Sequence, residues 1–287
     1  MSKKAVGGTA LGAAICRLIE AYQPEATRIC TDTLAKELIP PIYHIMLQSA
    51  SMRNFTVEKT EAVAAGIYGA QVCRTRCIDE AVSRHLAAGM KQLVILGAGL
   101  DSRAYRLPGM EKVSVFEVDL PYVQAAKKKR IIKTLGQLLP NATYLPIDFS
   151  SQDLAEVLAV SDFDAAVPAI FIWEGVMQYL LEEDVRRTLT FIGNAQQGSV
   201  LLFTYVLRSI IQRQSPAAER LMDTMQDQGS PWYFGLDPAK LDEYLKPFHL
   251  KVLSDCGARE YKEKYLKPIG RELTLPETEH TVEAVVV

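Results

Sequence analysis

The residues with the clearest chemical potential lie around one short apolar segment. Residues 93–96 (Leu-Val-Ile-Leu) form a run that is typical of a strand buried on both faces of a parallel sheet. Gly97-Ala98-Gly99 follows, and glycines in such a turn let the backbone lie close against a bound nucleoside. A second strand-like segment, 113–119, ends on Asp119, 20 residues after Gly99, where a carboxylate can accept both ribose hydroxyls. This order of strand, turn, strand and acid predicts a nucleoside-binding site.

Two absences from the sequence narrow the choice of nucleoside. A dinucleotide-binding fingerprint would place a third glycine at position 102, where Ser102 stands instead. The sequence also contains no Gly-Lys-Ser or Gly-Lys-Thr of a phosphate-binding loop. An adenosyl ligand without a pyrophosphate fits this pattern better. The sequence therefore predicts S-adenosylmethionine as the cofactor.

Residues 96–107 (Leu-Gly-Ala-Gly-Leu-Asp-Ser-Arg-Ala-Tyr-Arg-Leu) and 116–121 (Phe-Glu-Val-Asp-Leu-Pro) resemble the leucine carboxyl methyltransferase family. The resemblance continues through four more segments, residues 74–79, 144–149, 171–180 and 198–206. It covers roughly residues 60 to 210 and is looser at both ends. The family includes bacterial relatives that methylate small molecules. The resemblance implies a Rossmann-like class I methyltransferase fold, an α/β architecture with a seven-stranded, mostly parallel sheet.

The resemblance also implies roles for individual polar residues. Arg74 is expected to hold the methionine carboxylate of the cofactor through its planar guanidinium. Asp148 is expected to accept from the adenine amino group with Phe149 against the ring, and Glu174 to lie beside the methionyl group. The alternatives are that Asp148 only stabilises a turn, and that Glu174 caps a helix or forms a salt bridge. The predicted cofactor-binding residues are Arg74, Gly97, Ala98, Gly99, Asp119, Leu120, Asp148, Phe149 and Glu174.

The chemistry of methyl transfer sets what else the site must contain. Transfer from a sulfonium to oxygen asks the protein mainly to align donor and acceptor and to exclude water. A carboxylate acceptor is already ionised near neutral pH, whereas a hydroxyl acceptor needs a general base. Glu174 and Tyr205, at the ends of the fourth and fifth expected strands, are the candidate catalytic residues. Tyr205 and residues 232–234 (Trp-Tyr-Phe) either line an acceptor pocket or pack in the core.

The sequence favours an S-adenosylmethionine-dependent O-methyltransferase that forms a carboxyl methyl ester on a small-molecule acceptor. Three alternatives stay open. They are methylation of a phenolic or alcoholic hydroxyl of a small metabolite, methylation of a protein's C-terminal leucine carboxylate, and cofactor binding without turnover. No histidine or lysine lies in a motif that would identify it as a general base. The sequence names neither the acceptor nor the oligomeric state.

Other charged or metal-ligating residues have plainer interpretations. Residues 127–130 (Lys-Lys-Lys-Arg) would face several sides of a helix, so we expect a solvated face and no nucleic-acid patch. Cys73 and Cys77 lie four residues apart without companion histidines, so we expect them to be buried and to bind no metal. Glu117 shares a strand face with Asp119 and stays a second candidate for the ribose role.

Composition is that of an ordinary globular protein. Of the 287 residues 48% are hydrophobic and 23% are charged, and the net charge of −2 gives no general attraction for nucleic acid or for an anionic membrane. Arg17 and Glu20 interrupt the apolar run near the amino terminus, so we expect no signal peptide and no membrane span. Five cysteines without a Cys-x-x-Cys pair indicate reduced thiols and a cytoplasmic protein.

The expected elements divide one methyltransferase domain, residues 1–287, into three parts. Residues 1–90 carry no strand signal and are expected to be a helical cap. Residues 91–206 and 249–287 are expected to form the cofactor-binding core, and residues 207–248 an insertion or lid. Strands that alternate with helices indicate βαβ units and a parallel sheet.

The cap helices are expected at residues 9–22, beginning at Thr9, at 31–39, and as one long helix over 57–88. The core helices are expected at residues 122–138, 152–159 and 182–195. The seven expected strands are residues 92–97, 113–119, 143–148, 169–173, 199–206, 249–254 and 280–287.

Overall fold

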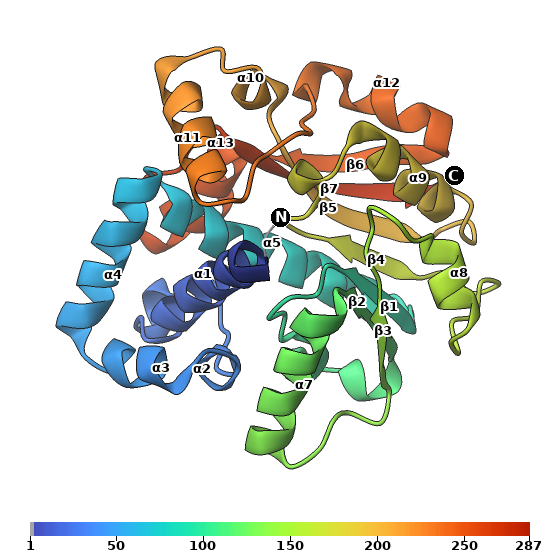
Figure 1. The fold of residues 1–287 in the computed structure, drawn as a ribbon, viewed down its shortest axis with the longest axis horizontal. Helices are drawn as coiled ribbons and strands as arrows, with labels where there is room; N and C mark the ends of the chain where they lie inside the picture. Colours follow the sequence, from blue (N-terminus) through green and yellow to red (C-terminus); the bar gives the residue numbers. More distant parts are fainter. Residues whose placement is uncertain (1–2) are drawn as a thin grey trace.

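The computed structural model describes residues 3–287, with side chains described from residue 8 onward. One seven-stranded sheet runs through the molecule, with helices on both of its faces (Figure 1). Its strands are β1 (Gln92–Leu96), β2 (Ser114–Asp119), β3 (Ala142–Pro146), β4 (Ile170–Trp173), β5 (Val200–Val206), β6 (Leu250–Cys256) and β7 (Glu279–Val286). They lie in the order β3-β2-β1-β4-β5-β7-β6, and β7 is antiparallel to both neighbours while β1 to β5 pair in parallel. The Rossmann-like class I methyltransferase fold predicted from the sequence is confirmed.

The strand order creates a crevice where the sequence places its ligand-binding residues. From β1 the chain moves outward to β2 and β3, and it then returns to β4 on the other side of β1. Leu93 of β1 lies opposite Val115 on one side and opposite Ile170 on the other, and all five β1 residues are buried. Such a switch in strand order leaves a crevice outside the carboxyl ends of the strands. The glycine turn after β1 stands at this crevice because the strand order reverses at β1.

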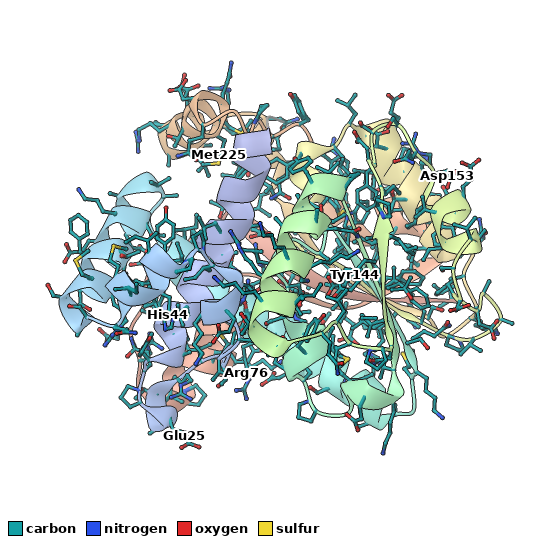
Figure 2. All side chains as sticks on the ribbon, turned by 60° about the horizontal axis from the view of Figure 1, so that its bottom comes forward. Glu25, His44, Arg76, Tyr144, Asp153 and Met225 are labelled. Carbon is teal, nitrogen blue, oxygen red and sulfur yellow. The ribbon has the colours of Figure 1, made fainter. Side chains whose placement is uncertain are left out.

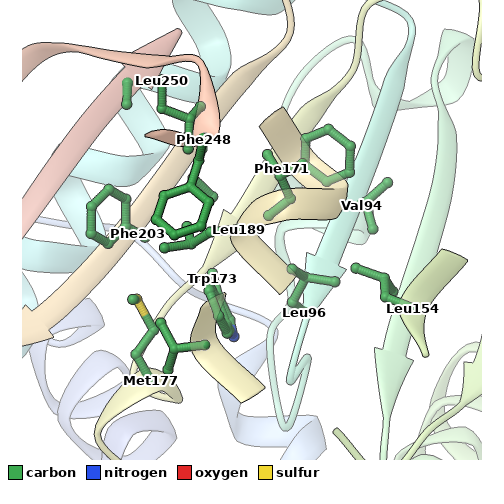
Figure 3. Packing of buried hydrophobic residues seen from close by; sticks show 14 of the residues in the cluster. Val94, Leu96, Leu154, Phe171, Trp173, Met177, Leu189, Phe203, Phe248 and Leu250 are labelled. Atoms are coloured by element: carbon green, nitrogen blue, oxygen red, sulfur yellow. The ribbon is translucent and has the colours of Figure 1, made fainter. Parts of the chain in front are cut away.

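Apolar side chains hold the core helices against both faces of the sheet. Those helices are α5 (Ile67–Ala87), α6 (Arg103–Arg106), α7 (Pro121–Leu135), α8 (Leu154–Ala159), α9 (Glu182–Gly193), α12 (Leu241–Leu245) and α13 (Ala258–Tyr261). On one face Phe171, Trp173 and Phe203 pack with side chains from α8, α9 and α12 (Figure 3). On the other face Ile95 and Ile78, the latter from α5, belong to a second cluster. The two layers fix the strand ends that carry the site.

The long cap helix predicted over residues 57–88 is wrong, because the chain breaks it near Gly66. The structure has α4 (Ala50–Val63) and α5 instead, and Gly66 between them has φ +86°. The Glu61 carboxylate accepts the backbone N–H groups of Gly66 (2.5 Å) and Tyr68 (3.1 Å), so it caps the new helix. A side chain at position 66 would also lie 2.6 Å from Pro276 Cδ. Both the backbone conformation and this close approach require glycine.

The amino-terminal helix is longer than predicted. It is α1 (Lys3–Ala21), so Thr9 lies inside the helix and does not begin it. After α1 the chain forms the short helices α2 (Ala35–Leu38) and α3 (Pro41–Leu47), which with α1 and α5 share one apolar cluster. In Figure 1 α1, α2, α3 and α4 lie to the left of the sheet, and α5 runs from this group toward the strands. These helices are the cap that stands over the crevice.

The segment predicted as an insertion has two parts with different packing. Helices α10 (Arg208–Ile211) and α11 (Pro216–Asp227) form a small apolar cluster of their own. By contrast Leu241 and Leu245 of α12, together with Phe248, belong to the main core. The remaining short turns are 3₁₀ segments at Glu25–Thr27, Met110–Lys112, Met177–Tyr179, Pro238–Lys240, Lys246–Phe248 and Lys267–Ile269, and a π-helical turn at Lys262–Leu266.

Candidate active site

A cavity of about 1300 Å³ lies at the carboxyl ends of the strands, between the sheet, the cap and α11. The structure brings to it every residue predicted to bind the cofactor: Arg74, Gly97, Ala98, Gly99, Asp119, Leu120, Asp148, Phe149 and Glu174. These residues come from five separate segments of the chain, so their meeting at one cavity is a property of the fold.

The glycine turn after β1 gives the cavity a floor made of backbone. Gly97 has φ +70° and Gly99 has φ +45°, a region that side chains rarely adopt. A Cβ atom at position 97 would lie 2.4 Å from Val176 Cγ2, and one at position 99 would lie 3.2 Å from Ala10 of α1. Glycine at these two positions therefore lets Val176 and α1 pack closely against the turn.

Asp119 is held in place by the turn itself. Its Oδ2 accepts the N–H of Gly99 at 2.5 Å, and its Oδ1 accepts the N–H of Leu120 at 2.6 Å. Burial raises the pKa of Asp119, and these two backbone donors oppose that shift. Each carboxylate oxygen has two lone pairs, so both can still accept from a ligand hydroxyl. The geometry is suited to a ribose diol.

Asp148 and Phe149 form the outer wall of this end of the cavity. Asp148 is exposed, and its Oδ1 accepts from the Ser150 N–H (3.0 Å) and hydroxyl (2.7 Å). Phe149 is buried, and its carbonyl oxygen accepts from Arg187 Nη2 at 2.7 Å. The two residues thus offer a carboxylate and an aromatic ring, as predicted, although Asp148 also stabilises its turn.

Glu174 lies between two arginines. Its Oε1 accepts from Arg74 Nε and its Oε2 from Arg103 Nη1, each at 2.7 Å. Burial alone would raise the pKa of Glu174, but the guanidinium groups of Arg103 and Arg74 outweigh it and hold the pKa well below its ordinary value. Gly175 follows with φ +67°, and a Cβ there would lie 3.6 Å from Arg74 Nη2. Glu174 is therefore an ionised, fully engaged carboxylate.

Arg74 makes ion pairs with two carboxylates, those of Glu174 and Glu279. Its Nη1 donates to both carboxylate oxygens of Glu279 (2.9 and 2.7 Å), and its Nη2 donates to Gln71 Oε1 at 2.7 Å. Burial would lower the pKa of Arg74, but Glu279 and Glu174 raise it above its ordinary value. A guanidinium has five N–H donors, so one N–H of Nη2 is left for a ligand among the described contacts.

The network continues through residues for which the sequence predicted no role in the site. Arg103 donates to Asp79 Oδ1 (2.7 Å) and to Asp101, and Asp79 also accepts two bonds from Arg106 (2.6 and 2.8 Å). Arg17 of α1 lines the cavity and donates to Asp32 Oδ2 (2.8 Å). Arg103 stands inside the family-like motif after β1, so its position was a usable signal. No sequence signal marked Arg17 or Glu279, because their partners are distant in the sequence.

Comparison with known proteins agrees with this geometry. The family model described as leucine carboxyl methyltransferase matches residues 10–193. The chain belongs to this family. A similar Mycolicibacterium smegmatis protein, named "Putative S-adenosyl-L-methionine-dependent methyltransferase", is 30% identical over 246 residues, which cover 84% of this chain and 80% of the relative. A Mycobacterium sp. (strain JLS) protein of the same name is 30% identical over 244 residues, which cover 82% of this chain and 78% of the relative.

Two solved structures resemble this family member in fold. One is a crystal structure titled as a "putative methyltransferase" from Thermobifida fusca, with TM-score 0.59 and 14% identity over 82% of this chain and 88% of that one. The other is a crystal structure of a DUF574 family protein from Streptomyces avermitilis, with TM-score 0.59 and 15% identity over 96% of this chain and 97% of that one. At these identities the likeness concerns the fold alone.

Tyr205, predicted as catalytic, does not reach the cavity of this family member. Its side chain is fully buried, and its hydroxyl donates to Asp255 Oδ2 at 2.9 Å and lies 3.3 Å from His280 Nδ1. Tyr205 lies on β5, the strand that the sequence predicts. Its hydroxyl points toward Asp255 of β6 and His280 of β7 and away from the cavity. Geometry gives no support for the catalytic role. Of the aromatic group in residues 232–234, Trp232 lines the cavity while Phe234 packs in the core.

Glu117 and the basic run also differ from expectation. Lys127 Nζ donates to Glu117 Oε2 at 2.6 Å, and both side chains are buried. Arg130 donates to the Leu38 carbonyl oxygen of the cap. The expected solvated face is therefore wrong for Lys127 and Arg130, which hold α7 to β2 and to α2. Glu117 faces Lys127 and does not line the cavity, so Asp119 alone of the two acids does.

Two glutamines that the sequence did not single out line the cavity with unpaired buried atoms. Gln71 Nε2 has no hydrogen-bond partner among the described residues, and its amide orientation is fixed because Oε1 accepts from Arg74. Gln178 Oε1 likewise has no partner in the described part of the chain. Unpaired buried polar atoms are uncommon in folded proteins and are costly without a partner. Both glutamines are therefore candidate ligand contacts.

Neither a metal site nor a membrane span is found in the part of the chain that the structure describes. Between residues 3 and 287 no helix is both long and apolar enough to cross a membrane. In the same range no three His, Cys, Asp or Glu side chains are grouped as metal ligands. Cys73 is fully buried, and Cys77 is partly buried.

Proposed function

We propose that this protein is an S-adenosylmethionine-dependent O-methyltransferase that forms a methyl ester on a carboxylate of a small molecule. When bound, S-adenosylmethionine supplies a methyl group on a positively charged sulfur. Family membership and the names of the relatives support the cofactor and the reaction class. The observation that supports a carboxylate acceptor is the engagement of Glu174 by two arginines.

The residues around the glycine turn fit an adenosyl cofactor. Gly97 and Gly99 line the cavity with backbone, which would let the nucleoside lie close against the turn. The free lone pairs of Asp119 suit the ribose hydroxyls, and Phe149 with Asp148 suits the adenine. The remaining N–H of Arg74 suits the methionine carboxylate, because a guanidinium binds carboxylates with well-defined geometry. Nothing in this arrangement calls for a pyrophosphate.

A hydroxyl acceptor needs a group that takes its proton. Burial raises the pKa of Tyr179, the tyrosine that lines the cavity, so its ionised form is disfavoured. Glu174 is a weak base, since Arg103 and Arg74 hold its pKa well below its ordinary value despite burial. No histidine and no lysine lines the cavity among the side chains described from residue 8 onward. Tyr205 lies outside it. A carboxylate acceptor arrives ionised, so these residues need only bind, align and exclude water.

The proposal is tested by the chemistry of the product. The protein is incubated with methyl-labelled S-adenosylmethionine and a panel of small carboxylic acids and phenols, and the product is treated with mild alkali. We expect labelled, alkali-labile product from acids, which releases methanol. Labelled, alkali-stable product from phenols, with the acids unmodified, would contradict a carboxyl acceptor. The Arg74→Ala variant is the control that ties any product to this cavity.

A further inference from the structure

We infer that the acceptor carries a hydrophobic chain or ring system, which lies in an apolar part of the cavity between α11 and the α4–α5 junction. This part, the tail chamber, is lined by Val63, Ile67, Leu221, Met225 and Trp232. The inference rests on the proposed function for the head group, a carboxylate. It adds the class of molecule that bears this group: an amphipathic carboxylic acid.

The first observation is the size of the cavity. Its volume is about 1300 Å³, larger than the roughly 300–1000 Å³ that holds one drug-sized ligand. One end is lined by the glycine turn, Asp119 and Phe149, where the cofactor fits. The other end is the tail chamber, which belongs to the same continuous cavity. A second ligand can therefore lie beside the cofactor without a separate binding site.

The second observation is that α11 turns one apolar stripe toward the cavity. Ala217, Leu221 and Met225 are spaced four residues apart, so they lie on one face of the helix, and all three line the cavity. Figure 2 labels Met225, which lies near the end of this helix. Met222 is buried in the same apolar cluster but does not line the cavity. Leu221 and Met225 thus both hold the helix in its apolar cluster and face the cavity, whereas Met222 only holds the helix.

The third observation concerns the α4–α5 junction. Val63 and Ile67 are 42% and 37% exposed, although both are large and apolar, and both line the cavity. Ala64, between them in the sequence, packs against the α11 cluster. Apolar side chains left exposed in a ligand cavity gain free energy when an apolar group covers them. A hydrophobic acceptor would cover these two.

The fourth observation is that the polar groups next to the α4–α5 junction are already used within the protein. Thr56 donates to the Met52 carbonyl oxygen (2.7 Å) and Thr60 to that of Thr56 (2.9 Å). The Glu61 carboxylate accepts from the backbone of Gly66 and Tyr68. A polar or sugar-like acceptor would therefore find few free partners at this junction. On the α11 side the Trp232 indole N–H has no hydrogen-bond partner among the described residues, so it can donate to one polar atom of an otherwise hydrophobic acceptor. The chamber is suited to hydrocarbon.

The test uses straight-chain monocarboxylic acids from four to ten carbons and measures kcat/KM for methyl transfer to each. Burying one methylene contributes free energy that corresponds to about a fourfold change in rate constant, so we expect kcat/KM to rise about two- to fourfold per carbon. Met225→Ala should flatten this rise and slow the longest acids about tenfold, with little effect on butanoate. Met222→Ala is the matched control and should keep the rise, because Met222 does not face the cavity.

A second readout separates this inference from the proposed function. Trp232 lines the chamber, whereas Trp173 is fully buried in the core, so fluorescence should report ligands in the chamber through Trp232. Straight-chain alcohols of the same lengths have no carboxylate, and their binding should still tighten with chain length. The Trp232→Phe variant should lose the signal. Tightening without methylation of any acid would support the chamber and remove the carboxyl acceptor. Methylation of acids with no dependence on chain length in rate or binding would overturn the chamber alone.

Discussion

The two ends of the cavity are built in different ways. At the cofactor end the polar side chains are already held by the protein: Asp119 by two backbone N–H groups, and Glu174 by two guanidiniums. At the tail chamber the lining is apolar, and Val63 and Ile67 are left partly exposed. Preorganised polar groups recognise one arrangement of atoms, whereas an apolar surface recognises size and hydrophobicity. We therefore propose that the polar end selects the cofactor and that a few apolar side chains select the acceptor.

The largest expected effect comes from Arg74, the most heavily engaged residue of the cofactor end. Arg74→Ala removes the guanidinium and leaves Glu174 and Glu279 without it, so S-adenosylhomocysteine binding should weaken by about 2–4 kcal/mol in calorimetry. Arg74→Lys should recover only part of the loss, because an ammonium cannot reproduce the planar fork.

The control for Arg74 is Arg76, on the same helix. Arg76 is exposed and pairs with Glu80 at i, i+4, so Arg76→Ala should leave cofactor affinity unchanged. Melting temperatures of both variants show whether the fold is intact. Full cofactor affinity in a folded Arg74→Ala protein would remove Arg74 from the site.

Asp119 should give the next largest effect. Asp119→Asn keeps the shape of the side chain but removes its charge and one acceptor, so the affinity for S-adenosylhomocysteine should fall by about 1.5–3 kcal/mol. Asp148→Asn should cost less, because Asp148 is exposed to water. A larger loss from Asp148→Asn than from Asp119→Asn in the same titration would reverse this ranking of the two acids.

The raised pKa of Asp119 adds a dependence on pH. A carboxyl whose pKa is raised on folding by burial stabilises the ligand-free protein below its unfolded pKa, and this contribution is lost as pH rises through the folded pKa. Ribose hydroxyls should favour the ionised form. The rise in melting temperature caused by S-adenosylhomocysteine should therefore shrink as pH falls toward the pKa of Asp119. In the Asp119→Asn variant this ligand-induced rise in melting temperature should shrink less as pH falls. Equal pH profiles of the rise in the variant and in the parent protein would contradict this account.

The smallest expected effect belongs to Tyr205. Tyr205→Phe removes one hydroxyl that bonds Asp255, so the free energy of unfolding should fall by about 1 kcal/mol. Turnover should stay within about twofold, because the hydroxyl lies outside the cavity. A loss of a hundredfold or more in kcat, in a protein that melts normally, would restore the catalytic role that the sequence suggested.

The sequence predicted which residues meet at the cofactor end of the cavity, because their positions follow from local patterns. The glycine turn, Asp119 and the Asp148-Phe149 pair each follow a strand directly, and parallel strands bring their carboxyl ends to one edge. The apolar runs that mark the strands therefore also place the acids. The break between α4 and α5 was missed because it depends on Pro276 approaching Gly66, and no pattern near Gly66 signals that contact.

The rest of the site depends on contacts between distant segments. Glu279 reaches Arg74 from the last strand of the sheet, across 205 residues of sequence, and the tail chamber combines the α4–α5 junction with α11. Tyr205 was placed correctly on its strand, but whether a strand-end residue faces the cavity depends on the neighbours β6 and β7. Register across the sheet decides such questions, and periodicity along one segment does not.

The role of Glu174 tests the central claim most directly, because a carboxyl methyltransferase needs it for position and a hydroxyl methyltransferase would use it as a base. Glu174→Gln should weaken S-adenosylhomocysteine binding, since Arg74 and Arg103 lose their shared partner, while kcat at saturating cofactor and acceptor stays within severalfold. The measurement is the cofactor affinity and kcat of this variant beside the parent protein. Unaltered affinity with kcat lowered about a hundredfold or more would identify Glu174 as a general base and contradict the account.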